Sequence, residues 1–125
     1  MRGRLSISQI SEIEKISEAN VAKITRLLRK ADLLKSIHGA NGGYELVNSP
    51  KEISLNTIIA AVSGSMYSAE YCEVAKGDCH ECVHLDECSI RPLWSFIQKK
   101  INDALASLTL EDLGKSEENV KKILN

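Results

Sequence analysis

Four cysteines lie within 17 residues in the second half of the chain, in the pattern Cys72-x6-Cys79-x2-Cys82-x5-Cys88. Thiolates are soft ligands that suit iron–sulfur clusters and zinc equally well, and four of them complete either site. Structural zinc sites usually contain two Cys-x2-Cys pairs, whereas only Cys79 and Cys82 have that spacing here. The spacing therefore favours an iron–sulfur cluster and leaves zinc open. Of the clusters, we expect 2Fe–2S, with 4Fe–4S as the alternative.

Two histidines in the same segment, His80 and His84, could each replace a thiolate as a ligand. A thioredoxin-like role for Cys79-His-Glu-Cys82 would need a strand before it and a helix after it, and the sequence indicates neither. The chain shows no secretory signal and no run of about 18 apolar residues, so we expect a cytoplasmic protein without a membrane partner. Disulfides are rare in that compartment, which again favours metal ligation.

The net charge of −1 conceals an asymmetry between the two halves of the chain. Residues 1–50 contain eight Lys and Arg against five Asp and Glu, a net charge of +3. Residues 51–125 contain eight basic and twelve acidic residues, a net charge of −4. A surface for a polyanionic partner is therefore expected in the N-terminal half.

Two short helices are predicted near the N-terminus. Ser6-Ile-Ser-Gln9 has capping-box spacing and opens a run in which isoleucine recurs every three residues, which predicts a helix over about 7–14. Ser17 is expected to cap a second helix. The predicted buried face of that second helix consists of Val21, Ile24, Leu27 and Leu28. Its opposite, basic side consists of Lys23, Arg26 and Lys30.

A β-hairpin is predicted after the second helix. Two short apolar segments flank Asn41-Gly-Gly43, and such turns need residues that tolerate positive φ. Two helices joined by a tight turn and followed by a hairpin are in the order of a winged helix-turn-helix. In that fold the second helix enters the major groove of DNA and the hairpin reaches phosphates or an adjacent groove.

Further helices are predicted in the rest of the chain. Ser54 is expected to cap a helix that ends at Gly64, and Pro92 suits the first turn of a longer helix. Thr109-Leu-Glu-Asp112 has capping-box spacing, and Ser116 is expected to cap a last short helix. The long helix carries apolar residues at heptad-like spacing, which predicts a partner surface: Trp94, Ile97, Ile101, Ala104 and Leu108.

Four segments resemble the Rrf2 family of bacterial transcription regulators, over roughly residues 5–113. They are Ile16-Ser-Glu-Ala-Asn-Val-Ala-Lys-Ile24, Leu28-Arg-Lys-Ala-Asp-Leu-Leu-Lys-Ser-Ile-His-Gly-Ala-Asn-Gly-Gly-Tyr-Glu-Leu46, Cys88-Ser-Ile-Arg-Pro-Leu-Trp94 and Leu108-Thr-Leu-Glu-Asp-Leu113. The resemblance implies a homodimer whose long C-terminal helices pack together and whose two recognition helices read a palindromic operator in double-stranded DNA.

The resemblance also implies that cluster-binding members use three loop cysteines and one further ligand, commonly a histidine after the third cysteine or an acidic residue of the first helix. Here Arg91 stands where that histidine would be, and Cys82 is an additional thiol. A site of four cysteines and an exchange between Cys79 and Cys82 both stay open.

The family normally begins with one further helix before the position of Leu5, and this sequence has nothing there. We therefore expect either a misplaced start or a truncated relative. The loss of that helix would expose the apolar faces of Ile7, Ile10 and Val21.

The sequence thus predicts a mainly α protein with a small β-hairpin, in three parts. Residues 1–64 form a winged-helix DNA-binding domain, 65–89 a cysteine-rich cluster-binding loop, and 90–125 a long dimerisation helix with a tail. The predicted metal ligands are the four cysteines. The predicted DNA contacts are Asn20, Lys23, Arg26 and Arg29 on the second helix, with Lys35, Ser36, His38 and Asn41 on the wing.

The predicted function is a transcriptional regulator, a repressor that senses iron–sulfur status, redox state or nitric oxide. No paired carboxylate, Ser-His pair or metal-water arrangement is legible, so we expect no enzyme. One alternative is a zinc-stabilised or thiol-switch winged-helix regulator without a cluster. Another is a small iron–sulfur electron carrier, which would have no need of a basic helix and a glycine-turned wing.

Overall fold

The computed structural model describes residues 3–63 and 87–125. These residues form helices and one two-stranded antiparallel sheet, which confirms the predicted fold class. In chain order the elements are α1 (Ile7–Glu14), α2 (Glu18–Lys30), β1 (Leu34–Ile37), β2 (Gly43–Leu46), the 3-10 helix η1 (Pro50–Glu52), α3 (Leu55–Ser63), α5 (Ile90–Ala106), α6 (Leu110–Leu113) and α7 (Glu117–Leu124).

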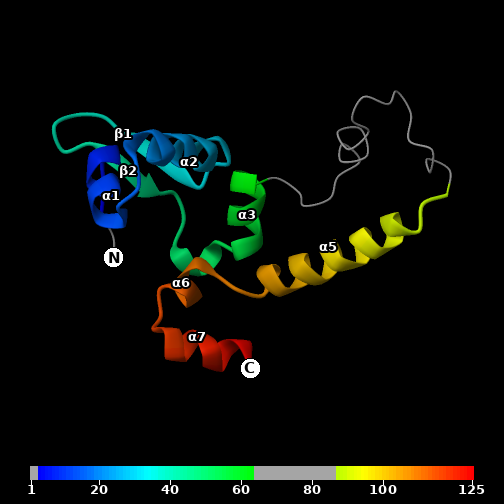
Figure 1. The fold of residues 1–125 in the computed structure, drawn as a ribbon. Helices are drawn as coiled ribbons and strands as arrows, with labels where there is room; N and C mark the ends of the chain where they lie inside the picture. Colours follow the sequence, from blue (N-terminus) through cyan, green and yellow to red (C-terminus); the bar gives the residue numbers. More distant parts are fainter. Residues whose placement is uncertain (1–2, 64–86) are drawn as a thin grey trace.

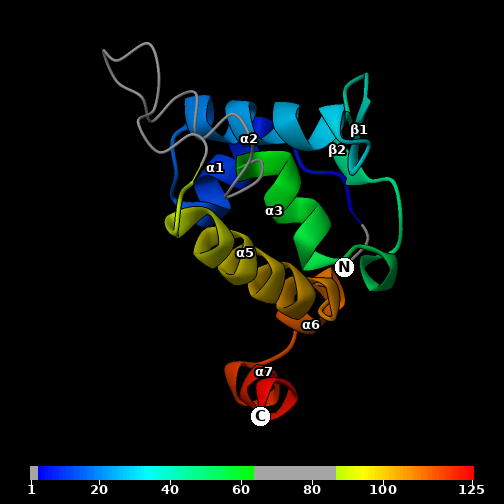
Figure 2. The same ribbon diagram turned by 90° about the vertical axis from the view of Figure 1, so that its right-hand side faces the viewer.

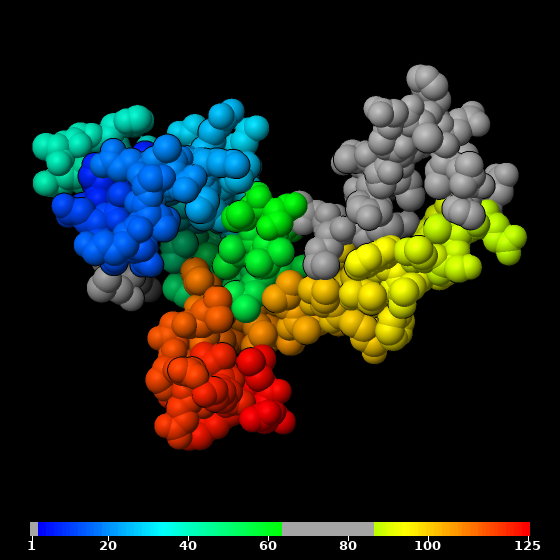
Figure 3. Space-filling model, in the orientation of Figure 1, coloured from blue at the N-terminus to red at the C-terminus, as the bar shows by residue number. Residues whose placement is uncertain are grey.

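Helices α1, α2 and α3 and the hairpin form one block, and α5 extends away from it (Figure 1). Seen from the side, α2 and the hairpin lie at one end of the molecule, α3 and α5 in the middle, and α7 at the other end (Figure 2). The surfaces of α1, α2 and the hairpin are continuous, whereas the N-terminal half of α5 projects from the block (Figure 3).

Local capping interactions set the bounds of the first two helices. The Ser6 hydroxyl accepts a hydrogen bond from the Gln9 amide at 3.2 Å, and the Gln9 side chain accepts one from the Ser6 amide at 2.9 Å. The Ser17 hydroxyl accepts from the Asn20 amide at 3.3 Å and begins α2. Lys15, with φ 57°, makes the sharp turn between the helices. The predicted bounds of α1 and the predicted cap of α2 are confirmed.

The buried face of α2 differs from the predicted one. Val21 and Thr25 are buried, whereas Ile24 is 37% exposed, so its assignment to the core was wrong. Thr25 was not predicted to be buried because it is polar. Its hydroxyl donates a hydrogen bond to the Val21 carbonyl at 2.8 Å, so the buried hydroxyl is satisfied. Val21 is only 2% exposed, which also contradicts the expectation that a missing helix would expose it. Ile7 and Ile10 are half-buried.

An isolated bridge attaches the N-terminal segment to the hairpin. Leu5 and Tyr44 form an antiparallel bridge, with the Tyr44 amide donating to the Leu5 carbonyl at 2.8 Å. Gly43 has φ 152°, and a Cβ atom there would lie 2.7 Å from the Leu5 carbonyl oxygen. Only glycine therefore permits this close approach of the N-terminal segment to β2.

The core joins the block to the second half of the chain. Its buried apolar side chains are Val21, Leu33, Ile53 and Leu55. Ser54 and Thr109 form an isolated antiparallel bridge, flanked by hydrogen bonds of 2.9 Å from Leu110 N to Ile53 O and from Leu55 N to Leu108 O. The segment after α5 is thus fastened to the start of α3.

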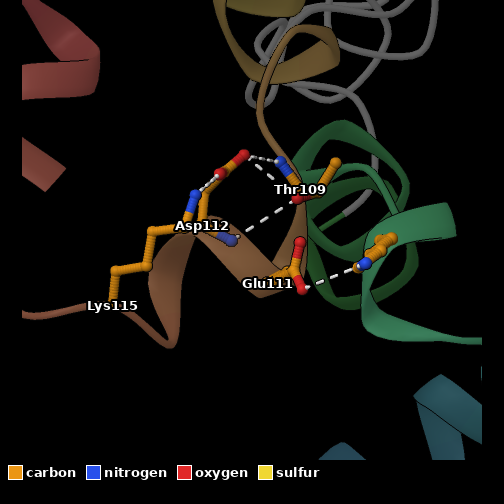
Figure 4. A network of polar contacts seen from close by, with 5 residues as sticks. Thr109, Glu111, Asp112 and Lys115 are labelled. Carbon is orange, nitrogen blue, oxygen red and sulfur yellow. Dashed lines mark hydrogen bonds and ion pairs between the residues drawn. The ribbon is translucent and has the colours of Figure 1, made fainter. Parts of the chain in front are cut away.

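Polar contacts hold α6 in this position (Figure 4). The Asp112 carboxylate accepts from the Thr109 amide at 3.0 Å, and Lys115 lies 2.7 Å from its other oxygen. Lys115, followed by the Thr109 donors, lowers the pKa of Asp112 to about 2, so this carboxylate stays ionised at neutral pH. Lys51 lies 3.9 Å from Glu111 and adds a weak, exposed ion pair. The predicted Thr109–Asp112 capping box is confirmed.

Helix α5 has no buried residue along its 17 positions. It contacts α3, and Ile97 and Ile101 are half-buried. Towards its N-terminus large apolar side chains are exposed: Ile90 57%, Leu93 55%, Trp94 38% and Phe96 59%. Within residues 3–63 and 87–125, no helix is long and apolar enough to cross a membrane.

Candidate nucleic-acid interface

The outer face of α2 carries three exposed cations. Each residue turns an α-helix by about 100°, which places Lys23, Arg26 and Lys30 on the side opposite the buried Val21 and Thr25. None of the three forms an ion pair with another part of the chain that the structure describes. Their charges are therefore available to an external anion.

Asn20 and Arg29 are exposed, but they lie on the flanks of α2. By helical geometry both residues lie closer than Lys30 to the buried side of α2. Lys30 was not among the predicted DNA contacts. The centre of the basic face consists of Lys23, Arg26 and Lys30. The sequence indicates this face by its spacing, because Arg26 and Lys30 follow Lys23 by three and seven residues.

The turn of the hairpin and helix α2 lie along the same edge of the molecule in both ribbon views (Figures 1 and 2). His38 and Asn41 are exposed in that turn. A basic helix and a projecting hairpin on one edge can contact one duplex together, because recognition helices occupy the major groove while neighbouring elements touch the backbone.

The strands separate two of the predicted wing contacts. Successive side chains of a strand point to opposite faces, so Lys35 and Ser36 lie on different faces of the hairpin. Lys35 pairs in register with Glu45, and its Nζ lies 2.8 Å from the Glu45 carboxylate. Ser36 pairs with Tyr44.

Glu45 also binds a second cation, Arg4, which was not among the predicted site residues. The Arg4 Nε donates to the Glu45 carboxylate at 3.1 Å. Lys35 first, and Arg4 second, lower the pKa of Glu45, so this carboxylate stays ionised at neutral pH. No local sequence pattern indicates the contact, because it depends on the bridge between Leu5 and Tyr44.

Of the predicted metal ligands, Cys88 alone lies in the part of the chain that the structure describes. It is a half-buried free thiol, directly before Ser89, the N-cap of α5. Cys72, Cys79 and Cys82, together with His80 and His84, lie outside the described residues. Within the described ranges no group of three or more His, Cys, Asp and Glu residues could hold a metal ion.

Comparison with known proteins identifies the family of this chain. The profile of the Rrf2 family, described as an iron-dependent transcriptional regulator, matches residues 1–116. A "Putative HTH-type transcriptional regulator" of Neisseria meningitidis is 34% identical over 94% of this chain and 76% of its own length. The regulator IscR of Vibrio campbellii is 36% identical over 90% of this chain and 64% of its own length.

Two solved structures are similar in both sequence and fold. T. potens IscR is 31% identical with a TM-score of 0.65, over 89% of this chain and 69% of that protein. CymR of B. subtilis, titled its global cysteine regulator, is 32% identical with a TM-score of 0.66, over 89% of this chain and 78% of that protein. The family and these relatives are transcriptional regulators rather than enzymes. The chain therefore belongs to the Rrf2 family of transcriptional regulators.

Proposed function

We propose that this regulator reads double-stranded DNA with the outer face of α2 and with the β1–β2 hairpin. The observation that carries the proposal is the set of three exposed cations on α2, Lys23, Arg26 and Lys30, which form no ion pair with the described residues. Helix α2 and the hairpin lie along one edge of the molecule (Figure 2). Regulators of this family bind DNA, which supports it. In the proposal residues 1–64 are the DNA-binding domain, 65–89 the cysteine-rich segment, and 90–125 the dimerisation helix and tail.

The active form is proposed to be a homodimer that binds a palindromic operator and represses transcription. The support is α5, whose apolar side chains Leu93, Trp94 and Phe96 are exposed in the structure. Large exposed apolar side chains on a helix that projects from its own domain are typical of a protein interface. A two-fold pair of such helices would carry two recognition helices, as a palindrome requires.

Replacing Leu93 by aspartate is expected to raise the dimer dissociation constant about 100-fold or more, because the dimer would bury an unpaired carboxylate. Sedimentation velocity at micromolar concentration measures the effect. Leu124→Asp is the matched control, since Leu124 is 64% exposed on α7, outside the proposed interface. A monomeric wild-type protein, or an unchanged dimer in Leu93→Asp, would contradict the proposal.

We further propose that Cys88, with Cys72, Cys79 and Cys82, ligates an iron–sulfur cluster of the 2Fe–2S or 4Fe–4S type. The donor set fits, because thiolates are the usual ligands of such clusters and Cys88 is a free thiol. The relatives named IscR and the family's iron-dependent description support it. A bound cluster is sensitive to oxygen, nitric oxide and iron supply. The residues of this chain would convert its presence into a changed DNA affinity.

Purification without oxygen is expected to yield a brown protein that contains iron and sulfide and little zinc. Visible absorption together with iron, sulfide and zinc analysis makes the measurement. The colour should be lost in Cys88→Ser, because a thiolate ligand is removed. It should persist in Ser89→Ala, which changes the neighbouring residue and keeps all four thiols. If the wild-type protein is colourless and contains zinc, the cluster proposal is wrong and the cysteines form a structural zinc site.

A regulator without a metal is the second candidate, and one observation favours it. The similar structure CymR is described as a global cysteine regulator, and another similar structure is an "oxidized form" of CymR from Staphylococcus aureus. In this candidate the cysteines act as a thiol switch. Metal-free, colourless protein whose DNA affinity changes on reversible thiol oxidation would support it over the cluster.

A further inference from the structure

A three-residue network links the N-terminal segment to the wing. Glu45 lies between two cations, with Lys35 Nζ at 2.8 Å from one of its carboxylate oxygens and Arg4 Nε at 3.1 Å from the other. The side chains of Arg4 and Lys35 are 48% and 52% exposed, whereas that of Glu45 is 26% exposed. The cations therefore face solvent more than the carboxylate does, and the network has a net charge of +1.

The network contributes little to stability, because exposed ion pairs are worth about 0–1 kcal/mol. Its effect is geometric. The register pairs Lys35 directly with Glu45, and the Leu5–Tyr44 bridge holds the residue after Arg4 against β2. Two long side chains are thereby restrained in direction, which lowers the entropy lost when they bind an anion.

Arg4 retains donors for such an anion. Its Nε donates to Glu45, and within the described residues no contact uses the other guanidinium nitrogens. A guanidinium can bind one oxyanion through one edge and another through the remaining donors. Lys35, a predicted wing contact, is bound to the same carboxylate.

We propose that Arg4 is a further DNA-phosphate contact, and that Glu45 is a positioning residue that holds Arg4 beside Lys35 at the wing. The proposal deepens the proposed function and rests on it. The ligand is a backbone phosphate of duplex DNA, so the contact adds affinity for any sequence and carries no base specificity.

The simplest variant, Arg4→Ala, cannot test this alone. It also removes the counter-charge of Glu45, and the freed carboxylate would repel DNA whether or not Arg4 touches a phosphate. The double variant Arg4→Ala/Glu45→Gln removes one positive and one negative charge, so the net charge of the protein does not change. Lys121→Ala/Glu117→Gln is the matched control, because it removes an ion pair on α7, far from the hairpin (Figure 2).

Fluorescence anisotropy with a labelled mixed-sequence duplex should be measured from about 50 to 200 mM KCl. If Arg4 contacts a phosphate, the plot of log K against log salt is less steep for Arg4→Ala/Glu45→Gln than for wild type, by about one unit of slope. At the lowest salt concentration the variant binds DNA about threefold more weakly, or weaker still. The α7 control binds as wild type does. Circular dichroism melting should show that both variants are folded.

Binding of Arg4→Ala/Glu45→Gln equal to wild type in affinity and slope overturns the proposal, because Arg4 would then only neutralise Glu45. The proposed function has a separate readout in the same titration. If the wild-type protein shows no salt-dependent binding to the duplex, the proposed function itself is wrong. If wild type binds and Lys23→Ala weakens binding while Arg4→Ala/Glu45→Gln does not, only the role of Arg4 fails.

Discussion

Replacing Lys23 and Arg26 together by alanine is expected to weaken binding to duplex DNA about 100-fold or more. Hydrogen bonds to charged groups contribute about 1.5–3 kcal/mol each, and every 1.4 kcal/mol is tenfold in affinity. Both side chains are exposed and form no ion pair among the described residues, so their loss should change folding stability by only about 0.5 kcal/mol. Anisotropy titration of a labelled mixed-sequence duplex at low salt measures the affinity.

The matched control is Lys121→Ala/Lys122→Ala. These two lysines lie on α7 and are 67% and 68% exposed, so the variant removes the same charge from the opposite end of the molecule. We expect this control to lose only a small, long-range electrostatic contribution to binding. Equal losses in the two double variants would mean that net charge, rather than the face of α2, determines affinity.

Ile53→Ala is expected to lower the free energy of unfolding by about 2–5 kcal/mol, the usual cost of truncating a buried isoleucine to alanine. Ile53 is 2% exposed, and it belongs to a small core that joins the block of α1, α2, α3 and the hairpin to the segment after α5. Since domains of this size are stable by about 5–15 kcal/mol, the loss is a large fraction of the total. Urea denaturation followed by circular dichroism gives the value.

Ile13→Ala provides the comparison at constant chemistry, because Ile13 is 61% exposed on α1. Its expected change is within about 0.5 kcal/mol. Protein concentration must be equal in all samples, because dimerisation adds a concentration-dependent contribution to stability. Similar losses in the two variants would show that the core does not lie around Ile53.

Local interactions made much of the fold predictable from the sequence. A cap requires a side chain and a backbone amide three residues apart, so Ser6, Ser17 and Thr109 could be identified from spacing alone. The hairpin was predictable for the same reason, since its two strands are close in the sequence. The predicted Asn41-Gly-Gly43 turn was wrong in detail, because positive φ occurs at Gly39 and Gly43, and Gly43 is the first residue of β2. The caps set the bounds of α1, α2 and α6.

Contacts between distant segments were not predictable. Thr25 is buried and Ile24 is exposed because of the way α2 packs, which the sequence pattern does not determine. The Thr25 hydroxyl makes its hydrogen bond within α2, so the sequence carries no apolar pattern that would indicate its burial. The contact of Arg4 with Glu45, 41 residues away, depends on the Leu5–Tyr44 bridge. The Ser54–Thr109 bridge likewise needs the complete fold before its partners meet.

The central claim is that the cations of α2 bind duplex DNA through its phosphates. The most direct test is the affinity of the wild-type protein for a mixed-sequence duplex, measured by anisotropy from about 50 to 200 mM KCl. Three phosphate contacts, one each for Lys23, Arg26 and Lys30, predict that affinity falls about 40-fold over this range. An affinity that stays constant with salt, or no binding at the lowest salt, would contradict the account.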